Sequence, residues 1–206
     1  YRERSHFDAQ NVLELGSSSP HSLNSGWLNR LVGALNNQDM AMAFGQSLPT
    51  VLRGKNNINS WAPSSLPDAG DDYLSLVQKV YERDPLLSRS YAKAINIQDM
   101  AMDAVDGVNM QKMTRESRSG QGFVTMAGTA GEWLSRQDGP RIATLEIGGW
   151  DTHAGQGTEG GRLANNLSIF ARGIEDLKKG LKQEWNKTAV IAMTEFGRTA
   201  RPNGNR

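Results

Sequence analysis

The sequence predicts an α/β domain built on a parallel-sheet core, and the prediction depends on three segments near its end. Arg141–Ile147 is a short run compatible with a strand, and Thr188–Thr194 is a second strand of the buried type. Between them, apolar side chains step by four and three residues along one helix face: Leu163, Leu167, Phe170, Ile174, Leu177 and Leu181. A strand, a helix and a strand in this order predict a right-handed βαβ unit with parallel strands.

The chain before this unit is predicted to be mainly helical. Apolar side chains at helical spacing predict helices over Asn24–Leu35, Asp71–Tyr81 (capped by Asp71), Pro85–Gly107 and Phe123–Arg136. Phe44–Leu52 is a strand or a loop edge, and Gly54–Asp68, rich in Asn, Ser and Pro, is a surface loop. We therefore expect residues 1–138 to form the mainly helical part of the domain and 139–206 the βαβ core segment.

The composition argues against several classes of protein. Lys and Arg number 23 against 22 Asp and Glu, so the net charge of +1 lacks the positive field of a nucleic-acid-binding protein. The absence of cysteine excludes disulfides and thiolate zinc sites. No apolar run reaches the about 18–20 residues that span a bilayer. We expect no nucleic-acid partner and no membrane span, and the sequence does not predict the oligomeric state.

Both ends of the chain resemble positions inside a longer domain. The chain begins at Tyr1-Arg2-Glu3-Arg4 without an initiator Met, a signal peptide or a leading strand. It stops in the turn-rich run Pro202–Arg206, soon after an apolar predicted strand. We expect an internal fragment, incomplete at both ends.

Each predicted strand is followed by a loop rich in polar and ionisable groups. Gly148–His153 follows the first strand and Glu195–Thr199 follows the second. In parallel α/β sheets, ligands bind outside the carboxyl ends of the strands. The sequence therefore predicts a functional site at this edge of the sheet, built by both loops.

Asp151 and His153 are the candidate metal ligands. In an extended loop, side chains two residues apart point the same way, so this carboxylate and imidazole could bind one divalent cation. Mixed Asp/His sets suit zinc or manganese, whereas magnesium and calcium prefer oxygen ligands. The alternative, an aspartate that caps the following turn beside an exposed histidine, stays open.

Glu195 and Arg198 are the candidate catalytic residues. Glu195 is a further ligand or holds a ligand in place, or it forms a salt bridge with Arg198. Arg198 clamps an anionic substrate oxygen through two hydrogen bonds, or it is a solvated surface residue. Trp150 forms a wall of the pocket or packs in the core.

A second polar cluster lies near the N-terminus. His6 and Asp8 repeat the Asp/His spacing in reverse order, but no strand precedes them, which favours an exposed loop. His21 also has loop neighbours. We keep His6, together with Trp150 and Thr199, as candidate substrate-binding residues.

Four segments in this order resemble one known family: Ser5–Gln10 (SHFDAQ), Ser25–Arg30 (SGWLNR), Gly148–His153 (GGWDTH) and Thr194–Thr199 (TEFGRT). Together they resemble the bacterial domain-of-unknown-function family 1501 over essentially the whole chain. Members of this family are similar to the alkaline phosphatase/sulfatase superfamily, and many carry a twin-arginine export signal. The resemblance thus implies an alkaline-phosphatase/sulfatase-like fold and a periplasmic or secreted protein.

The resemblance also implies a metal centre, with Zn, Mn, Ca or Mg, at the sheet edge. Asp151 and His153 match the segment that provides metal ligands, and Glu195 and Arg198 match the segment beside that site. A strand and a Gly-rich loop with an Asp ligand and the nucleophile are expected before Tyr1. A Gly-Thr-Asp-His-Gly segment with further ligands is expected after Arg206.

The leading hypothesis is a metal-dependent hydrolase of phosphate or sulfate esters, acting on an anionic small-molecule ester. The metal would polarise the ester oxygen while Arg198 balances charge on the transferring group. The alternative is an exported, non-enzymatic binding or scaffold protein that retains the fold, because fold does not imply function. A nucleotide or sugar-phosphate mutase on the same fold also stays open.

Overall fold

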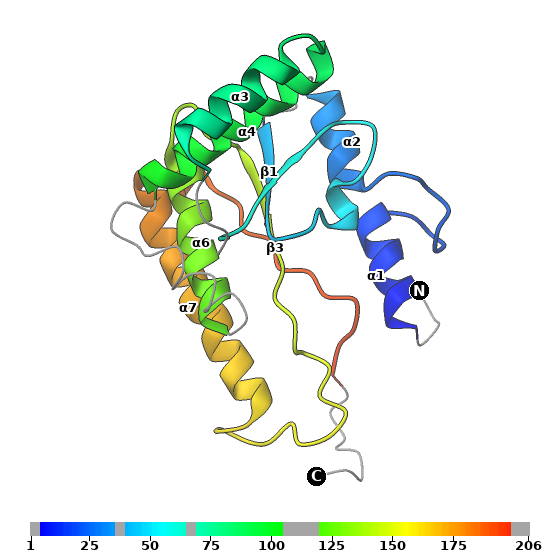
Figure 1. Cartoon of the computed structure of the whole chain (residues 1–206). Helices are drawn as coiled ribbons and strands as arrows, with labels where there is room; N and C mark the ends of the chain where they lie inside the picture. The colour runs from blue at the N-terminus through cyan, green and yellow to red at the C-terminus, as the bar shows by residue number, and fades with distance from the viewer. Residues whose placement is uncertain (1–4, 36–39, 65–68, 105–119, 199–206) are drawn as a thin grey trace. The chain divides into compact units, whose positions relative to one another are not determined.

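A computed structural model describes residues 5–35, 40–64, 69–104 and 120–198 of the chain (Figure 1). The elements in chain order are α1 (His6–Leu15), α2 (Trp27–Ala34), β1 (Ala41–Phe44), η2 (Thr50–Leu52), β2 (Asn59–Trp61), α3 (Asp71–Tyr81), α4 (Pro85–Ala104), α6 (Gly120–Ser135), β3 (Ile142–Leu145), α7 (Arg162–Leu181) and η3 (Lys182–Lys187), where η marks a 3-10 helix.

Contacts divide the chain into two compact units. Unit 1 consists of Tyr1–Ala62 and Phe123–Arg206, and unit 2 is Pro63–Gly122. The boundary between residues 138 and 139 was inferred from composition and stays a prediction. The candidate loops of the functional site belong to unit 1.

Unit 1 contains a three-stranded parallel sheet in the order β2-β1-β3. In its register, Ala41 of β1 lies opposite Ile142 of β3, and Phe44 lies opposite Leu145 on one side and Trp61 on the other. The predicted α/β class with a parallel sheet is confirmed. Two of its three strands come from the part of the chain that was predicted to be mainly helical.

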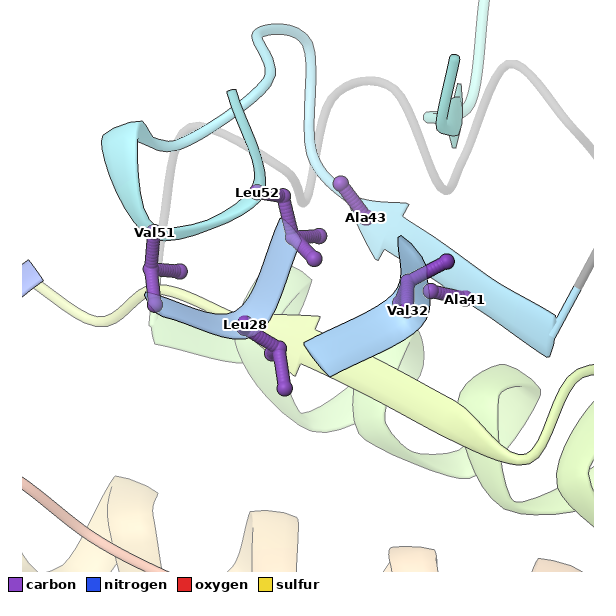
Figure 2. Close-up of a cluster of buried hydrophobic side chains, with 6 residues drawn as sticks. All are labelled: Leu28, Val32, Ala41, Ala43, Val51 and Leu52. Atoms are coloured by element: carbon purple, nitrogen blue, oxygen red, sulfur yellow. The ribbon is translucent and has the colours of Figure 1, made fainter. Parts of the chain in front are cut away.

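Helices cover both faces of this sheet. Side chains along β1 alternate between the faces, and Ala41 and Ala43 face a cluster formed with α2 and η2 (Figure 2). The other members of that cluster are Leu28, Val32, Val51 and Leu52. From the other face, the Phe44 ring lies 5.4 Å from the Trp133 ring of α6. Apolar burial on both faces gives the three layers of an α/β domain.

The predicted second strand, Thr188–Thr194, is not formed in the described part of the chain. Residues 188–198 contain no strand, and Val190, Ile191 and Met193 are 43%, 71% and 50% exposed. The helix before it, α7, is present as predicted. The βαβ prediction was therefore wrong in its last element. An apolar run suits a strand, but a strand also needs a neighbour, and β3 pairs only with β1 among the described residues.

Two short strands fall where other structure was predicted. β1 ends at Phe44, where the predicted strand or loop edge Phe44–Leu52 begins, and the last residues of that segment form η2. β2 lies inside Gly54–Asp68, which was predicted to be entirely surface loop. All four residues of β1 are buried, so its sequence lacks the polar–apolar alternation that marks a half-exposed strand.

The remaining predicted helices are confirmed as α2, α3, α4 and α6. The prediction that Asp71 caps α3 was wrong: Gly70 is the N-cap residue, and Asp71 is the first residue of the helix. The carboxylate that caps a helix in unit 2 is Asp84, which accepts hydrogen bonds from the backbone N–H groups of Leu86 and Leu87 at the start of α4. The predicted end of this helix at Gly107 lies outside the described residues. Within the described ranges, every helix is too short or too polar to cross a membrane.

Asn29 of α2 joins segments of unit 1 that are distant in sequence. Its side chain is buried, and its amide donates hydrogen bonds to the carbonyls of Leu52 and Asn56, each at 2.8 Å. Its side-chain oxygen accepts from the backbone N–H of Asn56 at 3.3 Å. Asn29 therefore satisfies backbone groups in two loops that would otherwise be buried without a partner.

Two other residues of the same segment also join α2 to neighbouring segments. Arg30 donates to the carbonyl of Leu15 at 2.8 Å and so holds the end of α1. Gly26 lies against the backbone of Val51 so closely that a Cβ atom would collide with it. Gly26, Asn29 and Arg30, here named the α2 anchor, explain the SGWLNR segment as architecture.

Glycines allow α6 and α7 to approach each other at backbone distance, which leads to a first prediction. A Cβ atom at Gly180 would lie 2.5 Å from the carbonyl oxygen of Gly128 and 2.7 Å from the backbone nitrogen of Glu132. Backbone atoms cannot rotate away, so we expect Gly180→Ala to lower the free energy of unfolding by about 2 kcal/mol despite its higher helix propensity. Denaturant unfolding of the purified protein would measure this change.

Gly128→Ala is the matched control. This glycine is also helical, but its added Cβ would meet only the Cβ of Asp176 at 3.7 Å, an ordinary contact. Because alanine favours a helix over glycine, we expect this variant to be more stable by about 0.5–1 kcal/mol. Equal effects from the two substitutions would show that close packing of α6 on α7 is not what Gly180 provides.

Candidate functional site

Hydrogen bonds from two side chains hold the backbone of the loop after β3 in a defined shape. The indole N–H of Trp150 donates to the carbonyl of Ile147 at 2.8 Å. Asn166 of α7 donates to the carbonyl of Gly149 at 2.6 Å. Gly149 has φ of 86°, a conformation that side chains disfavour, so glycine is needed at this turn. These contacts set the direction in which Asp151 leaves the sheet.

Four ionisable side chains from three segments meet beyond the loop. Asp151 Oδ2 lies 2.6 Å from His153 Nε2 and 3.5 Å from His6 Nε2. His6 Nδ1 in turn lies 3.6 Å from Glu195 Oε1. We name His6, Asp151, His153 and Glu195 the carboxylate–histidine cluster. The side chains of His6 and Asp151 are each 42% exposed, so the cluster is open to solvent and accessible to a ligand.

His6 reaches this cluster from a helix and not from a loop. It is the first residue of α1, and the Ser5 hydroxyl caps the helix by accepting a hydrogen bond from the Asp8 N–H at 3.2 Å. The prediction of an exposed N-terminal loop was therefore wrong. A short helix with one capping serine gives a weak apolar pattern, whereas the cap itself was a readable signal. Asp8 lies 3.6 Å from His21.

Arg198 fixes the end of the second loop against the first. One of its terminal nitrogens donates to the Thr152 hydroxyl at 3.0 Å and to the Gln156 side-chain oxygen at 2.9 Å. The other donates to the carbonyl of Trp150. Its guanidinium also lies 5.7 Å from the centre of the Phe196 ring. Asp151 and Arg198 are thus carried by loops in direct contact, although the strand predicted to deliver Arg198 is absent.

Two aromatic rings pack beside the site. The Trp150 ring packs edge-on against Phe170 of α7, with the centroids 6.3 Å apart. The Phe196 ring packs edge-on against the His6 imidazole at 4.8 Å. Thr199, predicted to bind substrate, lies outside the described residues.

The carboxylates and imidazoles of the cluster are groups that bind divalent metals, but the distances between them do not all fit a metal site. Ligand atoms of one tetrahedral zinc ion lie about 3.3–3.5 Å apart. The 3.5 Å between Asp151 Oδ2 and His6 Nε2 agrees with that value, whereas the 2.6 Å to His153 Nε2 is a hydrogen bond. Among the residues that the structure describes, no three His, Asp or Glu side chains are arranged to hold a metal ion. The cluster, as described, is a set of closely spaced carboxylates and imidazoles.

Two residues of the site were not found from the sequence. Thr152 is only 8% exposed, and its hydroxyl donates to the Gln156 oxygen at 3.0 Å while accepting from Arg198. Gln156 lies in a Gly-rich run, where a polar residue is expected in any case. Thr152 lies between the two candidate ligands in the sequence, and this position could have indicated a role in the site. Nothing in the sequence around Gln156 indicated one.

Glu146, the residue directly after β3, is a titratable group near this edge of the sheet. Burial raises the pKa of its carboxyl above the ordinary value of 4.5, the nearby Glu14 raises it further, and Arg53 lowers it. The folded protein therefore binds this proton more tightly than the unfolded chain. The contribution of Glu146 to stability is thus most favourable at acid pH and is lost as the pH rises through the raised pKa.

We expect Glu146→Gln to stabilise the protein at neutral pH, because a neutral amide avoids the cost of burying a carboxylate. Thermal melting between pH 4 and pH 8 would show the effect as a smaller decline in Tm above pH 4.5 than in the parent protein. Identical slopes in the two proteins would contradict the assignment of this pH dependence to Glu146.

A family model described as "Protein of unknown function (DUF1501)" matches residues 2–206. The chain belongs to this family. No curated protein and no solved structure matches it. The predicted DUF1501 resemblance is confirmed, and the relation to the alkaline phosphatase/sulfatase superfamily stays a prediction.

Proposed function

We propose that this DUF1501 chain carries part of the active site of a metal-dependent hydrolase of phosphate or sulfate esters. One observation supports the proposal above all others. Three segments that are far apart in sequence bring His6, Asp151, His153 and Glu195 together, and the Arg198 guanidinium of the second loop contacts the loop that carries Asp151. Ionisable side chains that converge in this way are typical of catalytic sites.

Asp151 and His153 are the residues that would hold the metal, with His6 as the next donor. A carboxylate with two imidazoles is a donor set that zinc and manganese accept, and magnesium or calcium would use more oxygen ligands. When bound, such an ion polarises the ester oxygen and activates a nucleophile. Glu195, 3.6 Å from His6 Nδ1, would orient that imidazole and fix which of its nitrogens carries the proton.

Arg198 is suited to bind the anionic part of the substrate. A guanidinium has five N–H donors, and three of them are engaged by Thr152, Gln156 and Trp150. The other two make no hydrogen bond to the described residues. The guanidinium is planar and already fixed, so these two N–H groups can donate to the oxygens of a phosphate or sulfate ester.

The proposal is tested by assaying the purified full-length protein, stripped with a chelator, on aryl phosphates and aryl sulfates. Zn, Mn, Ca and Mg would be added singly, and bound metal would be measured by elemental analysis. We expect turnover that appears with one of these metals and disappears on renewed chelation. Absence of both metal uptake and turnover would falsify the proposal, whereas metal binding without turnover would favour the exported binding protein.

We also propose a periplasmic or secreted location, on the strength of the resemblance alone. Fractionation of cells that express the natural full-length protein would test this. Recovery in the cytoplasmic fraction would contradict it.

A further inference from the structure

We propose that Gln156 is a positioning residue that fixes the guanidinium of Arg198 for its role in the site. The part that concerns catalysis rests on the proposed function, whereas the part that concerns the guanidinium does not. Gln156 is in an exposed loop and touches no member of the carboxylate–histidine cluster through a described hydrogen bond. Its contribution would therefore act through Arg198.

Gln156, Thr152 and Arg198 form a closed ring of hydrogen bonds. Arg198 donates to the Thr152 hydroxyl at 3.0 Å and to the Gln156 oxygen at 2.9 Å, and the hydroxyl donates to the same oxygen at 3.0 Å. Because a guanidinium offers donors only, the oxygen of the Gln156 amide has to face it. Both partners of Arg198 in this ring thus orient each other as well as the guanidinium.

The backbone around Gln156 is shaped to present this side chain. Gly155 and Gly157 on either side of it have φ of 64° and 73°, which glycine adopts without strain. The Gln156 carbonyl accepts a hydrogen bond from the Leu163 N–H in the first turn of α7 at 3.4 Å. A Cβ atom at Gly161 would collide with that same carbonyl. Gln156 therefore connects the first turn of α7 to the guanidinium.

A fixed guanidinium has a consequence for transition-state stabilisation. Arg198 keeps two donors for a substrate oxygen, and their direction is set by the three hydrogen bonds that the other donors make. Loss of one acceptor allows the group to rotate, and displacements of about 1 Å can cost about 100-fold in rate. We therefore expect Gln156→Ala to reduce kcat by about 10- to 100-fold, with a smaller change in KM.

The decisive experiment measures the order of the Arg198 side chain and does not depend on turnover. In ¹⁵N-labelled chain, the Nε–H signal of Arg198 is assigned by its loss in Arg198→Lys, and its heteronuclear NOE is measured. We expect a value close to that of ordered backbone in the parent protein. Gln156→Ala should lower it, and Gln156→Glu, which keeps an oxygen acceptor, should retain it. Gln137→Ala, an exposed glutamine without a described side-chain hydrogen bond, is the control.

The outcomes separate the inference from the proposed function. An Arg198 signal that is equally ordered in Gln156→Ala overturns the inference, whatever the activity. Loss of order in that variant supports positioning even if the parent protein turns over no ester, in which case only the proposed function fails. If the parent protein is active and Gln156→Ala mobilises Arg198 without lowering kcat, the catalytic consequence is overturned. Thermal melting of each variant excludes global unfolding as the cause.

Discussion

Replacing Asp151 by asparagine is expected to reduce kcat/KM of the metal-loaded full-length protein by about 100- to 1000-fold. The carboxylate lies at the centre of the cluster, since one oxygen contacts both His153 and His6. Asparagine has nearly the same shape but no charge, so it would weaken both the attraction for a cation and the pairing with the imidazoles. The loss should therefore appear in metal content as well as in rate.

Elemental analysis and steady-state kinetics on the same samples would measure this effect. Asp72→Asn provides a matched control, because Asp72 is an exposed carboxylate in the first turn of α3 in unit 2. We expect the control to retain metal and activity. If Asp151→Asn retained both as well, the carboxylate–histidine cluster would be a surface ion-pair network without a role in metal binding.

Replacing Asn29 by leucine is expected to lower the free energy of unfolding by about 3–4 kcal/mol, the largest effect on stability that we anticipate. The side chain is 1% exposed, and its amide serves the carbonyls of Leu52 and Asn56. Leucine would leave these carbonyls buried without a donor, and each loss of this kind costs about 1–3 kcal/mol. Asn29→Asp would keep the acceptor for the Asn56 N–H but would bury a carboxylate oxygen against the same two carbonyls, so it should destabilise the protein at least as much.

Chemical denaturation followed by circular dichroism would give these differences. Asn165→Leu is the control, because Asn165 is exposed on α7 and makes no side-chain hydrogen bond among those described. That substitution should change stability by no more than about 0.5 kcal/mol. A similar small change at Asn29 would mean that solvent satisfies the loop carbonyls when the amide is absent.

The helices could be predicted from the sequence because each has an apolar stripe at helical spacing. Leu163 to Leu181 gave the clearest pattern, and α7 covers Arg162–Leu181. The sheet was harder to predict. β1 is four residues long and entirely buried, and β2 is three residues long, so neither shows the alternation that identifies a strand. Thr188–Thr194 has strand-like composition, but pairing depends on a distant neighbour that composition does not reveal.

The loops of the candidate site were predicted to lie together, and the contact between Arg198 and the Trp150 carbonyl brings them together. The prediction assumed that both loops follow parallel strands, but only the first loop follows a strand in the described structure. His6 was kept as a candidate but was assigned to a loop, because a capped helix of ten residues leaves little periodic signal. Gln156 could not be found, since its role depends on a fold around two glycines that sequence spacing does not define.

Because the α2 anchor supports α1, a substitution there can change activity through the fold, and a screen for loss of function would not distinguish this from a direct effect on the site. Arg30 binds the carbonyl of Leu15 at the far end of α1, and the first residue of that helix is His6. On the proposed function, a substitution that frees the helix would move an imidazole of the cluster and reduce turnover without touching a reacting atom. The place of His6 at one end of α1 thus depends on a hydrogen bond made at the other end, and a parallel measurement of folding would tell such variants apart from variants of the cluster itself.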